Sequence, residues 1–204
     1  MKKVVFVFLI FTTIWCRSNQ EEYRELMKSI LQGDEKKVEE KLKLVDQSQP
    51  IKVKGKNASG EVVEVLTYPI FFAIDQIIRF IYAKESGKAS VGYEISKKIL
   101  ESIDDIDIQN NNKDTLVSHV LKAIYSLFKD GIYSKYLCQL FQLVLKKQPN
   151  LDIEIRPNKT VKGFITALLS DKGFNDFFED KNRKFLNLLS DISAENQKED
   201  IGVG

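Results

Sequence analysis

The sequence contains few of the residues on which many enzymes and disulfide-bonded proteins depend. Among its 204 residues there are 2 cysteines, 1 histidine, 10 glycines and 4 prolines. Two cysteines cannot form a disulfide framework, and glycine is too scarce and scattered to cradle a nucleotide phosphate. The chain also has no Gly-x-Ser-x-Gly or His-Glu-x-x-His motif. The sequence therefore gives no support to nucleotide binding or to these hydrolase chemistries.

The residues that carry chemistry have no partners at motif spacing. His119 lies near the start of an expected helix, and metal binding or general-base catalysis there would need distant ligands. The carboxylates Asp104, Asp105 and Asp107 lack the glycine and the final glutamate of a calcium loop. Cys138 lies among apolar residues and fits a small core position. We therefore expect no enzyme, no catalytic residue, no metal and no cofactor.

No charge of either sign predominates beyond the first residues. The chain has 31 basic and 29 acidic residues, and Lys2 and Lys3 are the charged residues of the first fifteen. Without these two lysines the remaining chain is neutral. Nucleic-acid-binding proteins usually carry a basic excess or stripe, so we expect no nucleic-acid partner.

The first residues have the layout of an export signal. Lys2 and Lys3 precede an apolar run from Val4 to Trp15, which is followed by Cys16 and a polar stretch. The run is too short for a transmembrane helix, which needs about 20 apolar residues. This order of segments resembles the signal of a bacterial lipoprotein of the spirochaete type, in which the cysteine is acylated.

The lipoprotein resemblance implies a signal peptide at 1–15, acylation of Cys16 and a lipid-anchored tether at 16–25. It implies an exported protein held at a membrane, on its periplasmic face or at the cell surface. Trp15 departs from the small residue that is usual before the cysteine. Cleavage after Ser18 by an ordinary secretory peptidase is the alternative, and the product would then be secreted.

Two stretches of the chain resemble each other at an offset of 45 residues, Leu100–Thr115 and Leu145–Thr160. Self-similarity at a fixed period is typical of stacked-repeat proteins, whose units bury their apolar faces against their neighbours. Such proteins usually bind other proteins. The repeat therefore predicts an interaction module.

Apolar residues recur at helical spacing and predict about eight helices in four pairs. Between the first two pairs, residues 51–54 and 61–66 alternate as strands around a turn at 55–60, which predicts a β-hairpin finger. The helical patterns lie at 26–31, 38–45, 70–81, 95–103, 116–128, 137–145, 164–169 and 185–192.

One stretch, Glu94–Asn110, resembles the second helix and exit loop of an ankyrin repeat, and Tyr68–Ala73 resembles the opening of its first helix. The departures are the period of 45 residues, where ankyrin repeats have about 33, and Lys113 in place of the turn glycine. The resemblance implies an all-α, ankyrin-like solenoid of helical pairs at 26–192, with a flexible tail at 193–204. A HEAT-type α-solenoid is the alternative.

The expected function is protein–protein interaction by a non-enzymatic, monomeric envelope lipoprotein, with a partner that the sequence does not name. The alternatives are an immunity or inhibitor lipoprotein against a toxin or hydrolase, and a small-ligand-binding or enzymatic helical protein. We expect contacts at the tips of the finger and turns, on the concave face of the solenoid. The predicted contact residues are Lys52, Lys54, Glu61, Glu64, Asn111, Asn112, Lys113, Asp114, Asn158 and Lys159.

Seven aromatic residues lie at mixed helical phases, which makes a single buried stripe hard to form. We expect most of them in the core and one or two at the surface. They are Phe71, Phe72, Phe80, Tyr82, Phe174, Phe177 and Phe178.

Overall fold

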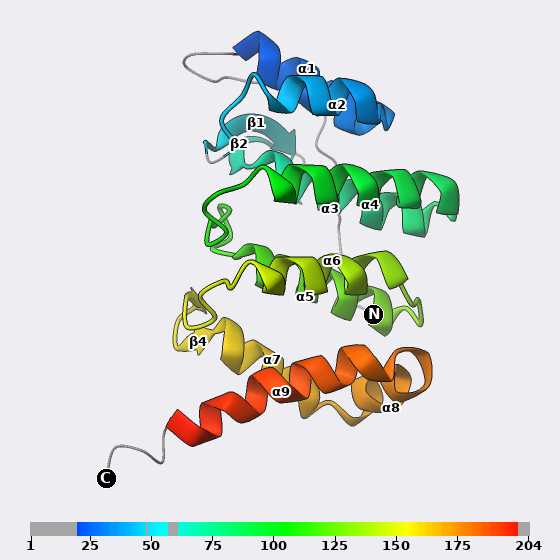
Figure 1. The fold of residues 1–204 in the computed structure, drawn as a ribbon, viewed down its shortest axis with the longest axis vertical. Coiled ribbons are helices and arrows are strands. Elements are labelled where there is room, and N and C mark those ends of the chain that lie inside the picture. Colours follow the sequence, from blue (N-terminus) through cyan, green and yellow to red (C-terminus); the bar gives the residue numbers. More distant parts are fainter. Residues whose placement is uncertain (1–19, 48, 57–60, 200–204) are drawn as a thin grey trace. The chain divides into compact units, whose positions relative to one another are not determined.

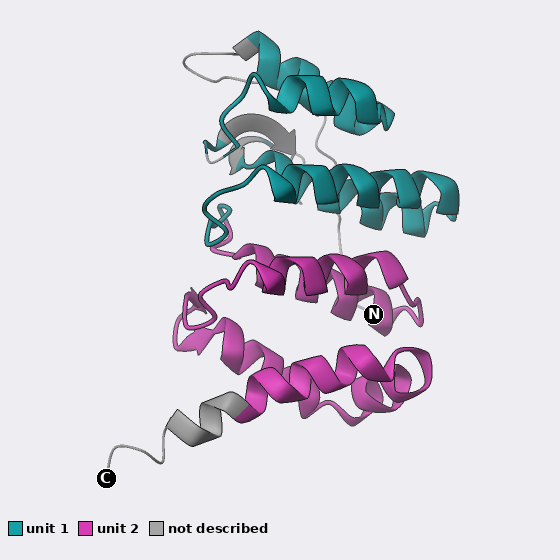
Figure 2. Ribbon diagram, in the orientation of Figure 1, with its two compact units in different colours: residues 1–111 teal, residues 112–204 magenta. Residues whose placement is uncertain are grey.

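The computed structural model describes residues 20–47, 49–56 and 61–199 (Figure 1). The predicted signal peptide, Cys16 and the first part of the predicted tether at 16–25 lie outside these residues. The rest of that tether, residues 20–25, is helical, because the first helix already begins at Gln20. The chain divides into two compact units, residues 1–111 and 112–204 (Figure 2).

The first unit consists of two helical pairs with a β-hairpin between them. Helix α1 packs on α3 and α2 packs on α4, so each pair covers an apolar face of the other. The strands of the hairpin are antiparallel, with Ile51 opposite Thr67. The elements are α1 (Gln20–Gln32), α2 (Glu35–Leu42), β1 (Ile51–Lys56), β2 (Val62–Thr67), α3 (Pro69–Tyr82) and α4 (Ser86–Glu101).

Helices α3 and α4 form the tightest contact of the first unit. Ile77 on α3 and Ile95 and Ile99 on α4 are fully buried. A Cβ atom at Gly92 would lie 3.1 Å from Cγ1 of Ile77, so the missing side chain lets the two helices approach closely. The apolar spacing that predicted these helices is therefore the spacing that fills the core.

An ion-pair clamp, formed by Lys98 of α4 with Glu35 and Glu39 of α2, joins the second helices of the two pairs. The Lys98 Nζ atom lies 2.9 Å from Glu39 Oε2 and 4.0 Å from Glu35 Oε2. The hydrogen bond to Lys98 lowers the pKa of Glu39, and the same bond raises the pKa of Lys98. Charges of opposite sign thus face each other where α2 meets α4.

The second unit repeats the order of helical pair, small β-hairpin and helical pair, with one additional helix. Helices α5 and α6 pack together, and α7 packs on α9. The elements are α5 (Leu116–Lys129), α6 (Lys135–Lys146), β3 (Glu154–Arg156), β4 (Lys159–Thr160), α7 (Val161–Leu169), α8 (Lys172–Lys181) and α9 (Arg183–Glu199).

In the sequence, α8 lies between α7 and α9, the two helices that were predicted as the last pair. Asp171 begins α8, because its Oδ1 accepts a hydrogen bond from the Phe174 amide at 3.2 Å. Its other oxygen, Oδ2, accepts hydrogen bonds from Tyr125 Oη at 3.1 Å and Lys129 Nζ at 3.0 Å. One carboxylate therefore both caps α8 and fixes it to α5.

An aromatic cluster forms much of the core around α8. The ring centre of Phe178 lies 4.6 Å from that of Phe174, 5.2 Å from Phe177 and 5.0 Å from Phe185. Phe174, Phe178 and Phe185 are buried, whereas Phe177 is half-buried. Phe174 and Phe178, one turn apart on α8, and Phe185 on α9 thus give α8 a strong apolar attachment.

The last helix also differs from the prediction at its end. The predicted flexible tail at 193–204 begins inside α9, which continues to Glu199. Residues 193–199 contain no proline or glycine, so the helix has no local reason to stop earlier.

The predicted fold class is confirmed. The chain is an all-α protein of repeated helical pairs with a β-hairpin between the first two pairs. A second, very short hairpin follows α6, where the sequence predicts only a turn. The resemblance to ankyrin repeats stays a prediction.

Candidate functional site

The connections between helical pairs are the predicted contact regions, and two of them have the same length and share several turns and helix caps. Helix α4 ends at Glu101 and α6 at Lys146, and the next helices begin at Leu116 and Val161. Both ends of the connection are thus repeated at the offset of 45 residues that the sequence shows. We call residues 102–115 the middle connection and residues 147–160 the second connection.

Equivalent hydrogen bonds start the two connections. The Asp107 amide donates to Asp105 Oδ1 at 2.9 Å, and the Asp152 amide donates to Asn150 Oδ1 at 2.9 Å. Each is a turn in which a side-chain oxygen binds the backbone two residues later. This contact accounts for Asp105, one of the carboxylates considered above as a calcium ligand.

Equivalent backbone angles and helix caps end the two connections. Lys113 has φ of 59° and Asn158 has φ of 60°, so both lie in the left-handed region. Two residues later, Thr115 accepts a hydrogen bond from the Ser118 amide and Thr160 accepts one from the Gly163 amide. The 45-residue repeat is therefore a repeat of hydrogen bonds as well as of residue types.

The tips of these connections carry exposed side chains. In the middle connection Asn111, Asn112 and Lys113 are exposed. Asp114 is different, because it is only 5% exposed and forms an ion pair with Lys122 of α5. Asp114 therefore belongs to the folded core of this connection, and its prediction as a contact residue is wrong.

The tip of the second connection is basic. Arg156, Asn158 and Lys159 are exposed, and Arg156 lies opposite Lys159 in the β3–β4 hairpin. The Asn158 amide donates to Glu154 Oε1 at 2.7 Å, which closes the turn. The Glu154 carboxylate thus closes the turn, and the side chains of Arg156 and Lys159 are left for solvent or a partner.

The connection between α2 and α3 is longer, because it contains the β1–β2 hairpin. Lys54 lies opposite Glu64 in the register, whereas Lys52 lies opposite Leu66. Glu61 precedes β2 and is exposed. Two large apolar side chains of this connection are exposed, Leu44 at 52% and Val62 at 64%.

Two side chains considered for chemistry, Cys138 and His119, lie on α6 and α5 of the second unit. Cys138 is buried, and burial raises the pKa of its thiol to about 12, which makes it a poor nucleophile at neutral pH. His119 is half-buried on α5. Within residues 20–47, 49–56 and 61–199, no three His, Cys, Asp or Glu side chains group as metal ligands.

Most of the seven aromatic residues are buried, as we expected. Phe71, Phe72, Phe174 and Phe178 are buried, and the others are partly exposed. We expected one or two at the surface, and Phe80, Tyr82 and Phe177 each reach it in part. The structure does not offer a fully exposed ring among the seven as an anchor for a partner.

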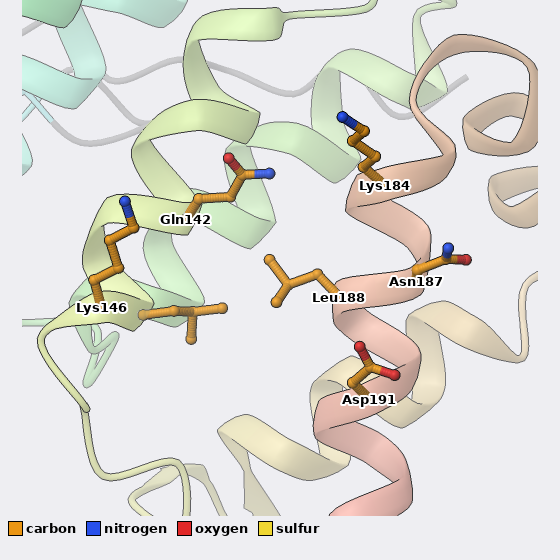
Figure 3. A pocket seen from close by; sticks show the side chains of 7 residues that line it. Gln142, Lys146, Lys184, Asn187, Leu188 and Asp191 are labelled. Atoms are coloured by element: carbon orange, nitrogen blue, oxygen red, sulfur yellow. The ribbon is translucent and has the colours of Figure 1, made fainter.

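A groove between α6 and α9 was not predicted (Figure 3). It has a volume of about 530 Å³ and is lined by Gln142, Leu145 and Lys146 of α6 and by Lys184, Asn187, Leu188 and Asp191 of α9. A smaller hollow of about 340 Å³ lies at the ends of α1 and α3 and the start of α4, where Phe80 of α3 and Lys88 of α4 line it. Neither hollow is lined by His119.

The sequence does contain a signal for α8, the helix between α7 and α9 that was not predicted. Asp171 followed by Phe174 three residues later is a capped helix start, and Phe174, Phe177 and Phe178 have helical spacing. Even with α8 predicted, the sequence would not have shown which helices α8 packs against.

Comparison with known proteins found no match, either among protein-family models or among curated proteins. In the described part of the chain no helix combines the length and apolar character that a membrane span requires.

Proposed function

We propose that this chain is a non-enzymatic, ankyrin-like envelope lipoprotein that binds another protein through the connections between its helical pairs. The observation that carries the proposal is the pair of connections with equal length and equivalent hydrogen bonds but different exposed tips. The backbone is repeated, whereas the tip residues are Asn111, Asn112 and Lys113 in one connection and Arg156, Asn158 and Lys159 in the other.

This arrangement suits recognition, because the parts that hold a loop and the parts that face outward are separate. Side chains such as Asp105, Asn150 and Thr160 fix the loops through hydrogen bonds. A loop that is already fixed loses little conformational entropy on binding, so more of its contact energy appears as affinity. The exposed tip residues are then available to determine which partner fits.

The envelope location rests on the N-terminal pattern, with Cys16 as the acylated residue. A lipid chain contributes about 0.8 kcal/mol per buried methylene, and stable anchoring needs more than one chain. Mass spectrometry of the mature protein tests this part of the proposal. Diacylated or triacylated Cys16 supports it, and an unmodified N-terminus at Asn19 contradicts it in favour of secretion.

Cross-linking to membrane extract, followed by binding assays with the purified partner, tests the interaction. One variant combines Arg156→Glu with Lys159→Glu, and another combines Asn111→Ala with Lys113→Glu. The control is Lys36→Glu, an exposed residue on α2. We expect at least one tip variant to bind roughly tenfold more weakly or worse, since contact residues at the centre of an interface often cost more than 1 kcal/mol.

The same binding assay can also refute the proposal. All these positions are exposed, so circular dichroism should show an intact fold for each variant. If the two tip variants and the control bind a captured partner with equal affinity, the connections do not form the contact surface.

A further inference from the structure

The α6–α9 groove has two walls, and each wall is one stripe of a helix. Gln142, Leu145 and Lys146 follow one another at i, i+3 and i+4 on α6. Lys184, Asn187, Leu188 and Asp191 follow at i, i+3, i+4 and i+7 on α9. Side chains at this spacing lie in line on a helix surface, so the groove runs along α6 for about one turn, roughly 6 Å, and along α9 for about two turns, roughly 10 Å.

The corresponding place in the first unit is closed. There the second helices of the two pairs, α2 and α4, pack directly on each other, with Lys98 clamped between Glu35 and Glu39. In the second unit the second helix of the earlier pair is α6 and its counterpart in the last pair is α9. These two helices are separated by the groove instead of being joined by an ion pair.

The groove carries two lysines and one aspartate. Lys146 on α6 and Lys184 on α9 are both exposed, and among the described residues neither is within ion-pair distance of a carboxylate. Figure 3 shows the two lysines on opposite walls, with Asp191 further along α9. Two lysines cannot pair with each other, and among the described residues Asp191 forms no ion pair with Lys146 across the groove, so α6 and α9 lack the clamp that Glu35 and Glu39 form with Lys98 in the first unit.

The floor of the groove is apolar. Leu145 and Leu188 are half-buried, and Leu188 points toward α6 in Figure 3. The groove is an open trough, which would leave much of a small molecule in water, whereas small-ligand sites usually bury 70–90% of the ligand. An elongated segment with apolar side chains along one face fits a trough between two helices better.

We propose that the α6–α9 groove binds a short, acidic, amphipathic helix of a partner protein. Apolar side chains of that helix contact Leu145 and Leu188, and carboxylates beside them form ion pairs with Lys146 and Lys184. Helix α2 shows the pattern within this chain, because its buried Val38 lies between Glu35 and Glu39, which both reach a lysine. This surface is separate from the tips of the connections.

Fluorescence anisotropy with three labelled synthetic peptides tests the proposal on the mature chain. Each peptide is a capped helix of about 14 residues, near the minimum length for helicity in water. The acidic peptide places leucines at i, i+4 and i+7 with glutamates beside them. The basic peptide replaces each glutamate by lysine, and the scrambled peptide has the acidic composition without the spacing.

We expect the acidic peptide to bind and the other two to bind at least tenfold more weakly. The double variant Lys146→Glu, Lys184→Glu should lose roughly fivefold or more in affinity for the acidic peptide and gain affinity for the basic one. Lys36→Glu and Lys159→Glu are matched controls outside the groove, and both should bind the acidic peptide like the unchanged chain.

Three results would overturn the inference. They are equal binding of the acidic and scrambled peptides, undiminished binding by the double variant, and a preference for vesicles of phosphatidylglycerol over the acidic peptide. Lys159→Glu is one of the two changes in the tip variant of the first assay, so measuring the single variant in both assays separates failure of one proposal from failure of the other.

Discussion

Shortening the Phe178 side chain should destabilise the second unit far more than the same change at its neighbour Phe177. The two residues are adjacent on α8, yet Phe178 is 1% exposed and Phe177 is half-buried. Phe178 contacts the rings of Phe174, Phe177 and Phe185 at 4.6–5.2 Å, so the substitution Phe178→Leu removes several favourable ring pairs.

The expected size of the effect follows from burial. A buried Phe→Ala change costs about 3–5 kcal/mol, and a change that keeps most of the volume usually costs less than about 1.5 kcal/mol. Each ring pair adds about 0.5–1.5 kcal/mol beyond its buried area. We expect Phe178→Leu to lower the free energy of unfolding by about 2 kcal/mol, and Phe177→Leu to lower it by about 0.5 kcal/mol.

Urea unfolding followed by circular dichroism measures the free energy, and hydrogen exchange with mass spectrometry locates it. In Phe178→Leu the amides of 172–189 should exchange faster, whereas those of 69–101 in the first unit should not change. Equal losses for the two variants, or a larger loss for Phe177→Leu, would refute the packing of α8 described here.

Three further predictions concern the repeated connections, the buried thiol and the cap of α8. Replacing Lys113 by glycine should raise the free energy of unfolding by up to about 1 kcal/mol, because a long side chain at positive φ is strained. Asn158→Gly should be close to neutral, since asparagine tolerates that region. Equal effects of the two substitutions in urea titrations would contradict the strain argument. Burial raises the pKa of the Cys138 thiol to about 12, so Cys138 should react with Ellman's reagent at pH 8 only in urea, and rapid reaction of the folded chain would show that the thiol is accessible. Because this folded pKa lies above the ordinary value of 9.0, the contribution of Cys138 to stability should be present below pH 9 and lost as the pH rises toward 12. The hydrogen bond from Lys129 lowers the pKa of Asp171 below its usual 3.8, so the contribution of Asp171 to stability is present above pH 3.8 and lost as the pH falls below it. The Asp171→Asn variant should therefore lose less stability between pH 5 and pH 3 than the unchanged chain. An identical pH profile for the two proteins would count against the pairing.

Much of the fold could be predicted because it is encoded by nearby residues. Apolar residues three and four apart define most of the helices, and the turn composition at 55–60 defines the hairpin. The similarity between Leu100–Thr115 and Leu145–Thr160 predicted that these segments share a structure. Their turns, positive φ angles and N-caps do occur at equivalent positions.

Properties that depend on distant contacts could not be predicted in the same way. Asp114 looks like an exposed loop residue, yet its ion pair with Lys122 places it in the folded core. The sequence predicted that most of the seven aromatic residues would be buried, but not which ones; Phe174 and Phe178 are buried because α8 folds against its neighbours. Burial depends on which faces meet, and no local pattern contains that information.

By itself, the sequence determined where the helices form, where the chain turns and which two connections are copies, because each follows from residues a few positions apart. Tertiary structure alone decided that α2 and α4 close on each other through Lys98, whereas α6 and α9 leave a groove with Lys146 and Lys184 on its walls. The physical reason is that helix contacts depend on complementary shape and charge between segments far apart in the chain, and these segments meet only when the chain has folded.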